Sequence, residues 1–181
     1  MTSLRQGDVH KRASPTCGRP LRRTLAAMQV RPATAADASR VSALIRSLSE
    51  PFFLLPGGDG ADLFLQSIGE PAVHGYIVSQ NFSYRVAESK NQLVGVVAMR
   101  DNSHLYHLFV APAFQGQGKA RQLWEFGKAQ AMHAGNPGRF TVNSGLGAVP
   151  VYERFGFVVS GPTVAKHGVS FRPMVLGENG G

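Results

Sequence analysis

Residues 108–120, LFVAPAFQGQGKA, combine the end of an apolar strand, a short loop and the start of a long helix at a glycine-rich turn. Gly116 and Gly118 lack a Cβ atom, so a ligand can approach the backbone closely there. The first N–H groups of a helix have no partner within the helix, and with the helix dipole they attract anions. Several hydrogen bonds to a charged group, at about 1.5–3 kcal/mol each, outweigh the dipole, at about 0.3–1 kcal/mol. The segment therefore predicts a diphosphate site.

Two common phosphate motifs do not fit this segment. A dinucleotide-binding fingerprint requires glycine where Arg121 stands. A P-loop requires Ser or Thr at Ala120 and glycine at Ala113. A glycine-rich turn that only caps a helix remains the structural alternative.

Outward from this turn, periodicity and turn residues predict a mixed α/β domain around one sheet. Thr34 is a plausible helix N-cap, Ser89-Lys90-Asn91 is expected to join a hairpin, and Gly69 and Pro71 are expected to end the second helix. Strands are expected at residues 28–31, 83–88, 92–100, 104–110, 139–143, 157–160 and 169–175, and helices at residues 35–49, 62–68, 116–133 and 146–154.

The net charge of +8 is concentrated at the N-terminus. Residues 1–27 hold six basic side chains against one acidic, which accounts for +5. We interpret residues 1–27 as a flexible basic arm, residues 28–176 as one domain and residues 177–181 as a loose tail. Three interpretations of this arm stay open: an extension upstream of Met28, a segment that contacts nucleic acid, and a targeting leader. The mildly basic body argues against nucleic acid as the main partner.

Composition excludes several other classes. The single cysteine, Cys17, permits no internal disulfide and no cysteine-cluster zinc site, and a reducing compartment such as the cytoplasm fits it best. No run of about 18 apolar residues predicts a membrane-spanning helix. His104 and His107 are predicted on opposite faces of their strand, which disfavours a metal site between them.

The chain resembles the GNAT superfamily of acetyl-CoA-dependent N-acetyltransferases over about residues 28–176. The family motif Arg/Gln-x-x-Gly-x-Gly/Ala is matched by QGQGKA at residues 115–120. A second motif, Tyr-Glu-x-x-Gly-Phe after an alanine, is matched within AVPVYERFGF at residues 148–157. The opening VRPATAAD, residues 30–37, is also similar to the usual start of the family.

This resemblance implies a mixed, mostly antiparallel sheet that splays between its fourth and fifth strands, flanked by helices, with acetyl-CoA in the wedge. The backbone of Leu108, Phe109 and Val110 would pair with pantetheine. Many members carry an asparagine where Gly145 stands, and Asn143 is the candidate to replace it. The backbone amides expected to hold the pyrophosphate are those of Gln115, Gly116, Gln117, Gly118, Lys119 and Ala120.

Acetyl transfer requires a neutral amine and a protonated leaving thiolate. A lysine-like amine has a pKa of about 10.4, so neutralising it at pH 7 costs about 4.6 kcal/mol. The resemblance implies Tyr152 as the general acid and His104 as the general base, acting through water, with His107 as the fallback. Tyr106 is expected to orient that water or the acceptor. Strand alternation predicts His104, Tyr106, Leu108 and Val110 on one face and Leu105, His107 and Phe109 on the other.

The sequence thus predicts an N-acetyltransferase that moves acetyl directly from acetyl-CoA, through a tetrahedral intermediate, to an unidentified amine on a small molecule or peptide. The resemblance places the acceptor beside residues 51–62, where residues 52–55 form an apolar wall or simply core. Glu50, Asp59 or Asp62 could attract an ammonium group. A non-catalytic CoA-binding module is the alternative function, and a homodimer is possible.

Overall fold

An eight-stranded, mostly antiparallel sheet forms the centre of the computed structural model, which describes residues 28–177. The strand order is β1-β2-β3-β4-β5-β8-β6, and β7 pairs with β8 beside this path. The strands are β1 (Gln29–Pro32), β2 (Phe82–Ser89), β3 (Gln92–Arg100), β4 (His104–Val110), β5 (Phe140–Ser144), β6 (Val158–Val159), β7 (Val164–Lys166) and β8 (Val169–Leu176). The predicted arm, residues 1–27, and residues 178–181 of the predicted tail lie outside the described residues.

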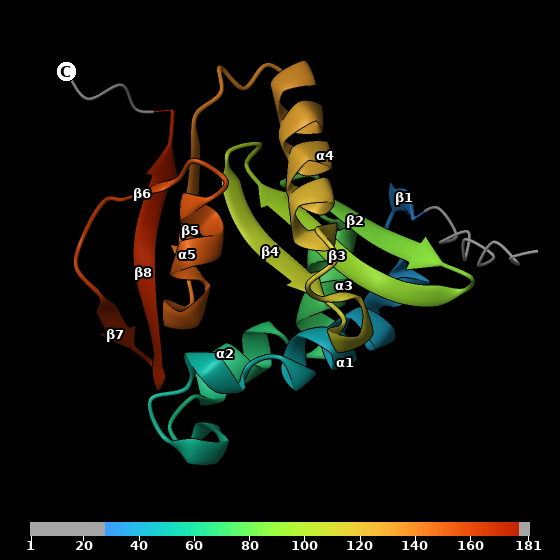
Figure 1. Ribbon diagram of the computed structural model, residues 1–181. Helices are drawn as coiled ribbons and strands as arrows, with labels where there is room; N and C mark the ends of the chain where they lie inside the picture. Colours follow the sequence, from blue (N-terminus) through green and yellow to red (C-terminus); the bar gives the residue numbers. More distant parts are fainter. Residues whose placement is uncertain (1–27, 178–181) are drawn as a thin grey trace, which may run out of the picture.

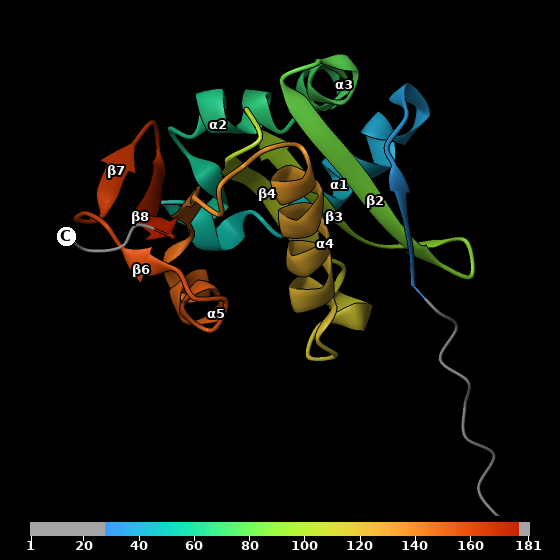
Figure 2. The ribbon, with the colours of Figure 1, turned by 90° about the horizontal axis from the view of Figure 1, so that it is seen from above.

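Helices cover both faces of the sheet, with α4 and α5 on one side and α1 to α3 on the other (Figures 1 and 2). One core cluster, around Trp124 and Phe140, lies beneath α4 and α5, and a second, around Ile45 and Val96, lies beneath α1 and α3. This confirms the predicted fold class. The helices are α1 (Ala38–Ser47), α2 (Asp62–Ser67), α3 (Glu70–Val78), α4 (Lys119–His133) and α5 (Val149–Glu153), and short 3-10 turns span Ala35–Asp37, Glu50–Phe52, Pro56–Gly58, Pro112–Phe114 and Leu146–Ala148.

Strands β2 and β3 form the predicted hairpin. They pair antiparallel from Phe82↔Arg100 to Ser89↔Gln92. The two turn residues, Lys90 and Asn91, have positive φ angles of 49° and 61°. A two-residue turn with both φ angles positive matches the twist of the strands that it joins.

Helix α3 is absent from the predicted elements. The sequence pattern predicts that Gly69 and Pro71 end a helix, and it predicts no helix directly after them. Pro71 instead lies in the first turn of α3, where its missing N–H would have had no partner in any case. The helix packs against α1 and β2, and it brings Tyr76 to the face of β4 that α1 to α3 cover.

A β-bulge in β4 corrects the predicted faces of that strand. The register with β3 runs Ala98↔His107 and then Met99↔Leu105, so Tyr106 is the extra residue. The rings of Tyr106 and His107 therefore lie on the same face, 4.6 Å apart between centroids. Leu105, Leu108 and Val110 pack into the cluster under α4, whereas Phe109 packs into the cluster under α1 and α3.

Among the strands of residues 28–177, only β4 and β5 pair in parallel, and they separate after two residues. His104 pairs with Thr141 and Leu105 with Val142, and no pairing follows. The two strands diverge beyond these positions, as the resemblance predicted for the fourth and fifth strands. The edge of β4 that faces β5 is thereby left without a strand partner from Tyr106 onward.

A buried carboxylate fixes the entry into α1. Asp37 is 3% exposed and accepts hydrogen bonds from the Arg31 guanidinium at 2.8 and 2.9 Å. It also accepts one from Arg40 Nε at 3.0 Å and one from the Thr34 backbone N–H at 2.7 Å. Glu88 of β2 binds both arginines. The Arg31 guanidinium, more than any other group, lowers the pKa of Asp37 far below its ordinary value.

We predict that Asp37→Asn lowers the free energy of unfolding by about 2 kcal/mol at pH 7, because charged hydrogen bonds are lost at a buried site. The pKa of Asp37 is depressed on folding, so this stabilisation is present above the unfolded pKa of about 3.9 and is lost as pH falls below it. Urea unfolding at pH 7 and pH 3 measures both effects. Asp101→Asn, an exposed acid that pairs with Arg100 at 3.5 Å, is the control and should cost under about 0.5 kcal/mol.

Candidate active site

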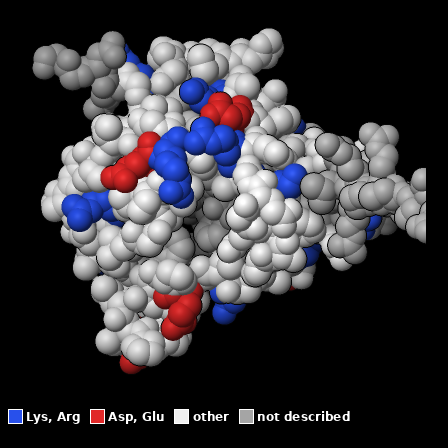
Figure 3. Space-filling view, in the orientation of Figure 1, with Lys and Arg blue, Asp and Glu red and all other residues white. Residues whose placement is uncertain are grey.

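A cavity of about 920 Å³ occupies the wedge between β4 and β5. Its walls come from β4, β5, β8, the start of α4, α5, and the segment that joins α1 to α2. Figure 3 shows a hollow in this face of the molecule, with Lys and Arg side chains along its upper edge. The cavity therefore gathers residues that lie far apart in the chain.

The predicted phosphate loop lies at one end of this cavity. Gly116 and Gly118 adopt left-handed backbone conformations, with φ of 70° and 73°, and for this reason α4 begins at Lys119 and not at Gly116. A Cβ atom built on either glycine meets no heavy atom within 4 Å. The space above the first turn of α4 is thus open to an anion.

Side chains of the loop hold its shape. The Gln115 side-chain amide donates to the Val110 carbonyl at 2.9 Å, and the Gln117 amide donates to the Ala113 carbonyl at 3.0 Å. Gln117 is the one predicted cofactor residue that does not line the cavity. The other predicted cofactor residues all line the cavity: Leu108, Phe109, Val110, Gln115, Gly116, Gly118, Lys119, Ala120 and Asn143.

Three cations line the same end of the cavity: Lys119, Arg121 and Arg154. Arg121 is held in place because it donates to the Arg154 carbonyl at 2.8 Å and lies 5.3 Å over the Phe155 ring. Open backbone donors at a helix start, with three cations beside them, fit a diphosphate group. The unpaired edge of β4 at Leu108–Val110 leads from this end toward the point of the wedge.

We call the backbone of residues 115–120 and the open space above it the phosphate cradle. We predict that Gly118→Ala weakens CoA binding by about tenfold or more, because the added methyl group would project into this space and strain a residue with a left-handed backbone conformation. Titration calorimetry with CoA measures this. Gly135→Ala is the matched control, since Gly135 has a φ of 96° and open surroundings at the other end of α4. Equal loss of affinity in both variants would show that strain, and not the cradle, is responsible.

Tyr152 of α5 lines the cavity. It is 8% exposed, and its ring packs against Phe155 and Phe157 with centroids 6.0 and 5.8 Å away. Among residues 28–177, no protein group hydrogen-bonds to its hydroxyl. Burial raises the pKa of Tyr152, so the phenol stays protonated at neutral pH.

His104 lies at the point of the wedge, where β4 and β5 still pair. Its Nδ1 atom is 2.7 Å from the Thr141 hydroxyl of β5, which fixes the ring. Burial, and then the positive charge of Arg100, lower the pKa of His104. The imidazole is thereby kept neutral and able to accept a proton at neutral pH. Thr141 is a contact of His104 that the sequence did not predict, because only the parallel pairing brings the two residues together.

The bulge places His107 and Tyr106 on the same side as His104, which corrects the prediction that the two histidines face away from each other. His107 is buried, its Nδ1 is 2.8 Å from the Tyr84 hydroxyl, and burial lowers its pKa to about 3. Tyr106 donates its hydroxyl proton to Tyr76 at 3.1 Å. All three β4 side chains line the cavity, but the hydroxyl of Tyr106 is already engaged.

Phe52 crosses the wedge from the segment between α1 and α2. Its ring lies 6.3 Å from that of Phe109 on β4, and a Cβ atom at Gly145, just beyond β5, would meet it at 3.0 Å. Gly145 is the position where the family commonly has asparagine, and here the aromatic ring takes up that space. Asn143 lines the cavity nearby. The pairing of Phe52 with Gly145 gave no signal in the sequence, because 93 positions separate them.

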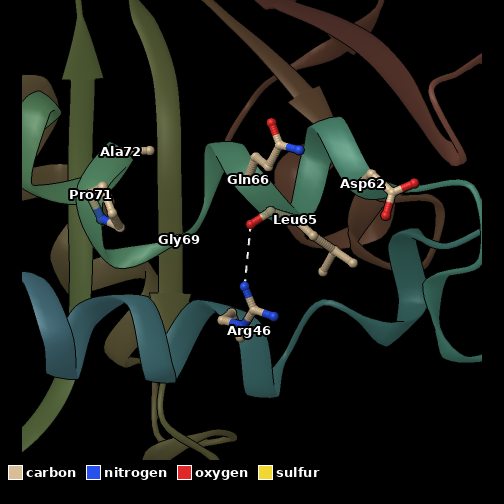
Figure 4. Close-up of a pocket in the computed structure, with 7 residues that line it drawn as sticks. All are labelled: Arg46, Asp62, Leu65, Gln66, Gly69, Pro71 and Ala72. Atoms are coloured by element: carbon tan, nitrogen blue, oxygen red, sulfur yellow. Dashed lines mark hydrogen bonds between the residues drawn. The ribbon is translucent and has the colours of Figure 1, made fainter.

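The acidic residues proposed to attract an ammonium group lie elsewhere. Glu50 accepts a hydrogen bond from the Gly57 N–H at 3.4 Å, and Asp59 is exposed. Asp62 lines a separate depression between α1 and the α2–α3 connection, where Arg46 donates to the Leu65 carbonyl at 3.3 Å (Figure 4). None of the described residues that line the main cavity is Asp or Glu.

The part of the chain from residue 28 to residue 177 holds no group of three or more His, Cys, Asp or Glu side chains arranged to bind a metal ion. Over the same residues, no helix combines the length and the apolar character needed to cross a bilayer.

Several solved structures of acetyltransferases have folds similar to that of this chain. A GCN5-related N-acetyltransferase from Rhodopseudomonas palustris is 18% identical, with 83% of this chain and 96% of that chain covered and a TM-score of 0.69. The PaiA N-acetyltransferase from Thermoplasma acidophilum, in complex with coenzyme A, is 12% identical, with coverages of 82% and 98% and a TM-score of 0.69. A variant of the spermidine N-acetyltransferase SpeG from Vibrio cholerae is 18% identical, with coverages of 82% and 93% and a TM-score of 0.57.

At the level of sequence, the acetyltransferase (GNAT) domain family matches residues 55–177. No curated protein matches the chain significantly. The family match covers more than half of the chain, including the phosphate loop and the Tyr152 helix. This protein therefore belongs to the GNAT family of acetyltransferases, which use acetyl-CoA as the acyl donor.

Proposed function

We propose that this acetyltransferase transfers the acetyl group directly to a primary amine, with His104 as general base and Tyr152 as general acid. One observation carries the proposal: a protonated, buried phenol and a neutral imidazole line the same cavity as the phosphate cradle. The residues that would hold the donor are the amides of Gly116, Gly118, Lys119 and Ala120 and the edge of β4 at Leu108–Val110. Asn143 would contact it from the opposite wall.

Bound acetyl-CoA supplies an activated thioester. His104 would take a proton from the amine, through a water molecule, as the new C–N bond forms. Tyr152 would give its proton to the sulfur as the C–S bond breaks. Each group keeps the required protonation state because of its surroundings: burial holds the Tyr152 phenol protonated, and burial with Arg100 holds His104 neutral.

His107 is the weaker candidate for the base. Its pKa of about 3 makes it a poor proton acceptor at neutral pH, and its Nδ1 is engaged with Tyr84. We assign it a positioning role, in which the Tyr84 contact fixes its ring beside Tyr106. We also propose that residues 28–176 form the catalytic unit.

Release of free thiol from acetyl-CoA, with mass detection of the acetylated amine, tests the proposed function. We expect thiol release to rise when a primary amine is added and the acetylated amine to accumulate in equal amount. Tight binding of CoA in calorimetry, with no turnover on a broad panel of amines, would instead indicate a non-catalytic CoA-binding module.

A further inference from the structure

We infer that the acceptor is a small amine whose only charge is the reacting amino group and whose remainder is apolar, and that it is not a polyamine. This inference rests on the proposed amine acetylation and adds the chemical class of the acceptor. It derives from the part of the cavity formed by the residues around α1 and α2 and by β8, where the helices lie across the sheet from α4 and its phosphate loop (Figures 1 and 2), and we call this part the acceptor wall. The acceptor wall consists of Leu48, Pro51, Phe52, Phe64, Ser67, Ile68, Val169 and Phe171.

The acceptor wall is apolar and aromatic. Seven of its eight residues have hydrocarbon side chains, and Ser67 uses its hydroxyl to donate to the Phe64 carbonyl at 2.7 Å. Phe52 stacks on Phe64 with ring centroids 5.8 Å apart and planes inclined by 27°, and Phe109 closes the row at 6.3 Å from Phe52. Rings in this arrangement accept another flat apolar group by stacking or edge contact.

The acceptor wall contains no charged side chain. No described residue lining the cavity is acidic, and its three lysine and arginine side chains, Lys119, Arg121 and Arg154, are those beside the phosphate cradle. Arg100 lies 5.5 Å over the Tyr106 ring and adds positive charge near His104. A second ammonium group on the acceptor would lose its water against hydrocarbon, with no carboxylate to pair with and cations nearby.

Phe52 also limits the length of the acceptor. It contacts β4 through Phe109 and reaches Gly145 across the wedge, so the aromatic row spans the open part of the wedge beyond the last paired residues, Leu105 and Val142. An extended polyamine chain would have to pass this ring, whereas a compact body would pack against it. Shape and charge therefore favour the same class of amine.

Kinetics with two sets of amines test the inference. Phenethylamine and benzylamine carry one amine on a compact apolar body, whereas putrescine and spermidine carry two or three amines on an extended chain. We expect kcat/KM for the better apolar amine to exceed that for the better polyamine by at least tenfold. A polyamine that reacts as fast as the apolar amines, or faster, would overturn the inference and leave the proposed amine acetylation standing.

A charge placed on the acceptor wall provides a second test. Ser67→Asp introduces a carboxylate there, and Ser67→Asn introduces a group of the same size without charge. We expect the Asp variant, relative to the Asn variant, to lower kcat/KM for phenethylamine several-fold and to raise it for spermidine several-fold. Thermal melting confirms that both variants fold, and CoA calorimetry confirms that the donor site is intact.

The experiments distinguish a failure of the inference about the acceptor from a failure of the proposed amine acetylation. Equal behaviour of the Asp and Asn variants toward both amines would show that the acceptor does not meet this wall, which overturns the inference alone. Binding of CoA with no acetylation of either set of amines would overturn the proposed amine acetylation, and the inference with it.

Discussion

Replacing Tyr152 with phenylalanine should lower kcat for acetyl transfer by about 10²–10³-fold while leaving the dissociation constant for acetyl-CoA unchanged. The change removes one oxygen atom from a side chain that is 8% exposed and lines the cavity. The ring contacts with Phe155 and Phe157 stay in place. The loss should therefore lie in the chemical step and not in folding or donor binding.

The reason is the state of the phenol. Burial raises its pKa, which keeps the phenol protonated throughout the neutral range and makes it a weaker acid, so the proton moves only as the C–S bond breaks and the sulfur becomes basic. No protein group among the described residues uses this hydroxyl, so its removal leaves no buried donor or acceptor unpaired. The free energy of unfolding should consequently change by less than about 0.5 kcal/mol.

Tyr106→Phe is the matched control, because it removes a hydroxyl from the same cavity. That hydroxyl already donates to Tyr76 at 3.1 Å, so we expect less than a tenfold loss of kcat. Steady-state kinetics with acetyl-CoA and the best amine, together with calorimetry, measure both variants. If Tyr152→Phe retained full kcat, the leaving group would be protonated by another group or by water, and the general-acid assignment would be wrong.

The parts of the site that depend on local sequence could be predicted. The phosphate loop is one continuous segment and was located from its glycines, but the helix was expected from Gly116, and the positive φ angles of Gly116 and Gly118 delay its start to Lys119. The role of Tyr152 was predicted only through the resemblance to a known family. No local sequence pattern places Tyr152 in the cavity, because its position depends on the packing of α5 and on the separation of β4 from β5.

The parts that depend on long-range contacts could not be predicted. Strand alternation failed at Tyr106 because nothing in the sequence of β4 marks a bulge, which depends on the register with β3. Helix α3 was missed because proline signals a helix start as well as a helix end. Residues 52–55 illustrate the same limit: Phe52 lines the cavity, whereas Leu54 and Leu55 are 50% and 53% exposed.

A His104→Gln variant should lose about 10²-fold in kcat/KM, calculated for the neutral amine, and should lose the acidic limb of that pH profile. Glutamine can keep a hydrogen bond to the Thr141 hydroxyl, now 2.7 Å from Nδ1, but it cannot take a proton from the amine. The wild-type profile should fall toward acid, because the imidazolium form has no free nitrogen to accept a proton. This fall should lie below the usual histidine pKa of about 6.5, since burial and Arg100 lower the pKa of His104.

Arg100 provides the sharper version of this experiment. Its positive charge disfavours the imidazolium, so Arg100→Gln should raise the pKa of His104 and move the acidic limb to higher pH. Arg100→Lys keeps the charge and should leave the limb in place. Because Arg100 also lies over the Tyr106 ring, a purely structural role would lower the rate in the glutamine variant without moving the limb. If the acidic limb shifts in Arg100→Gln and disappears in His104→Gln, His104 is the base. If the limb stays fixed in Arg100→Gln and persists in His104→Gln, His104 takes no part in the mechanism.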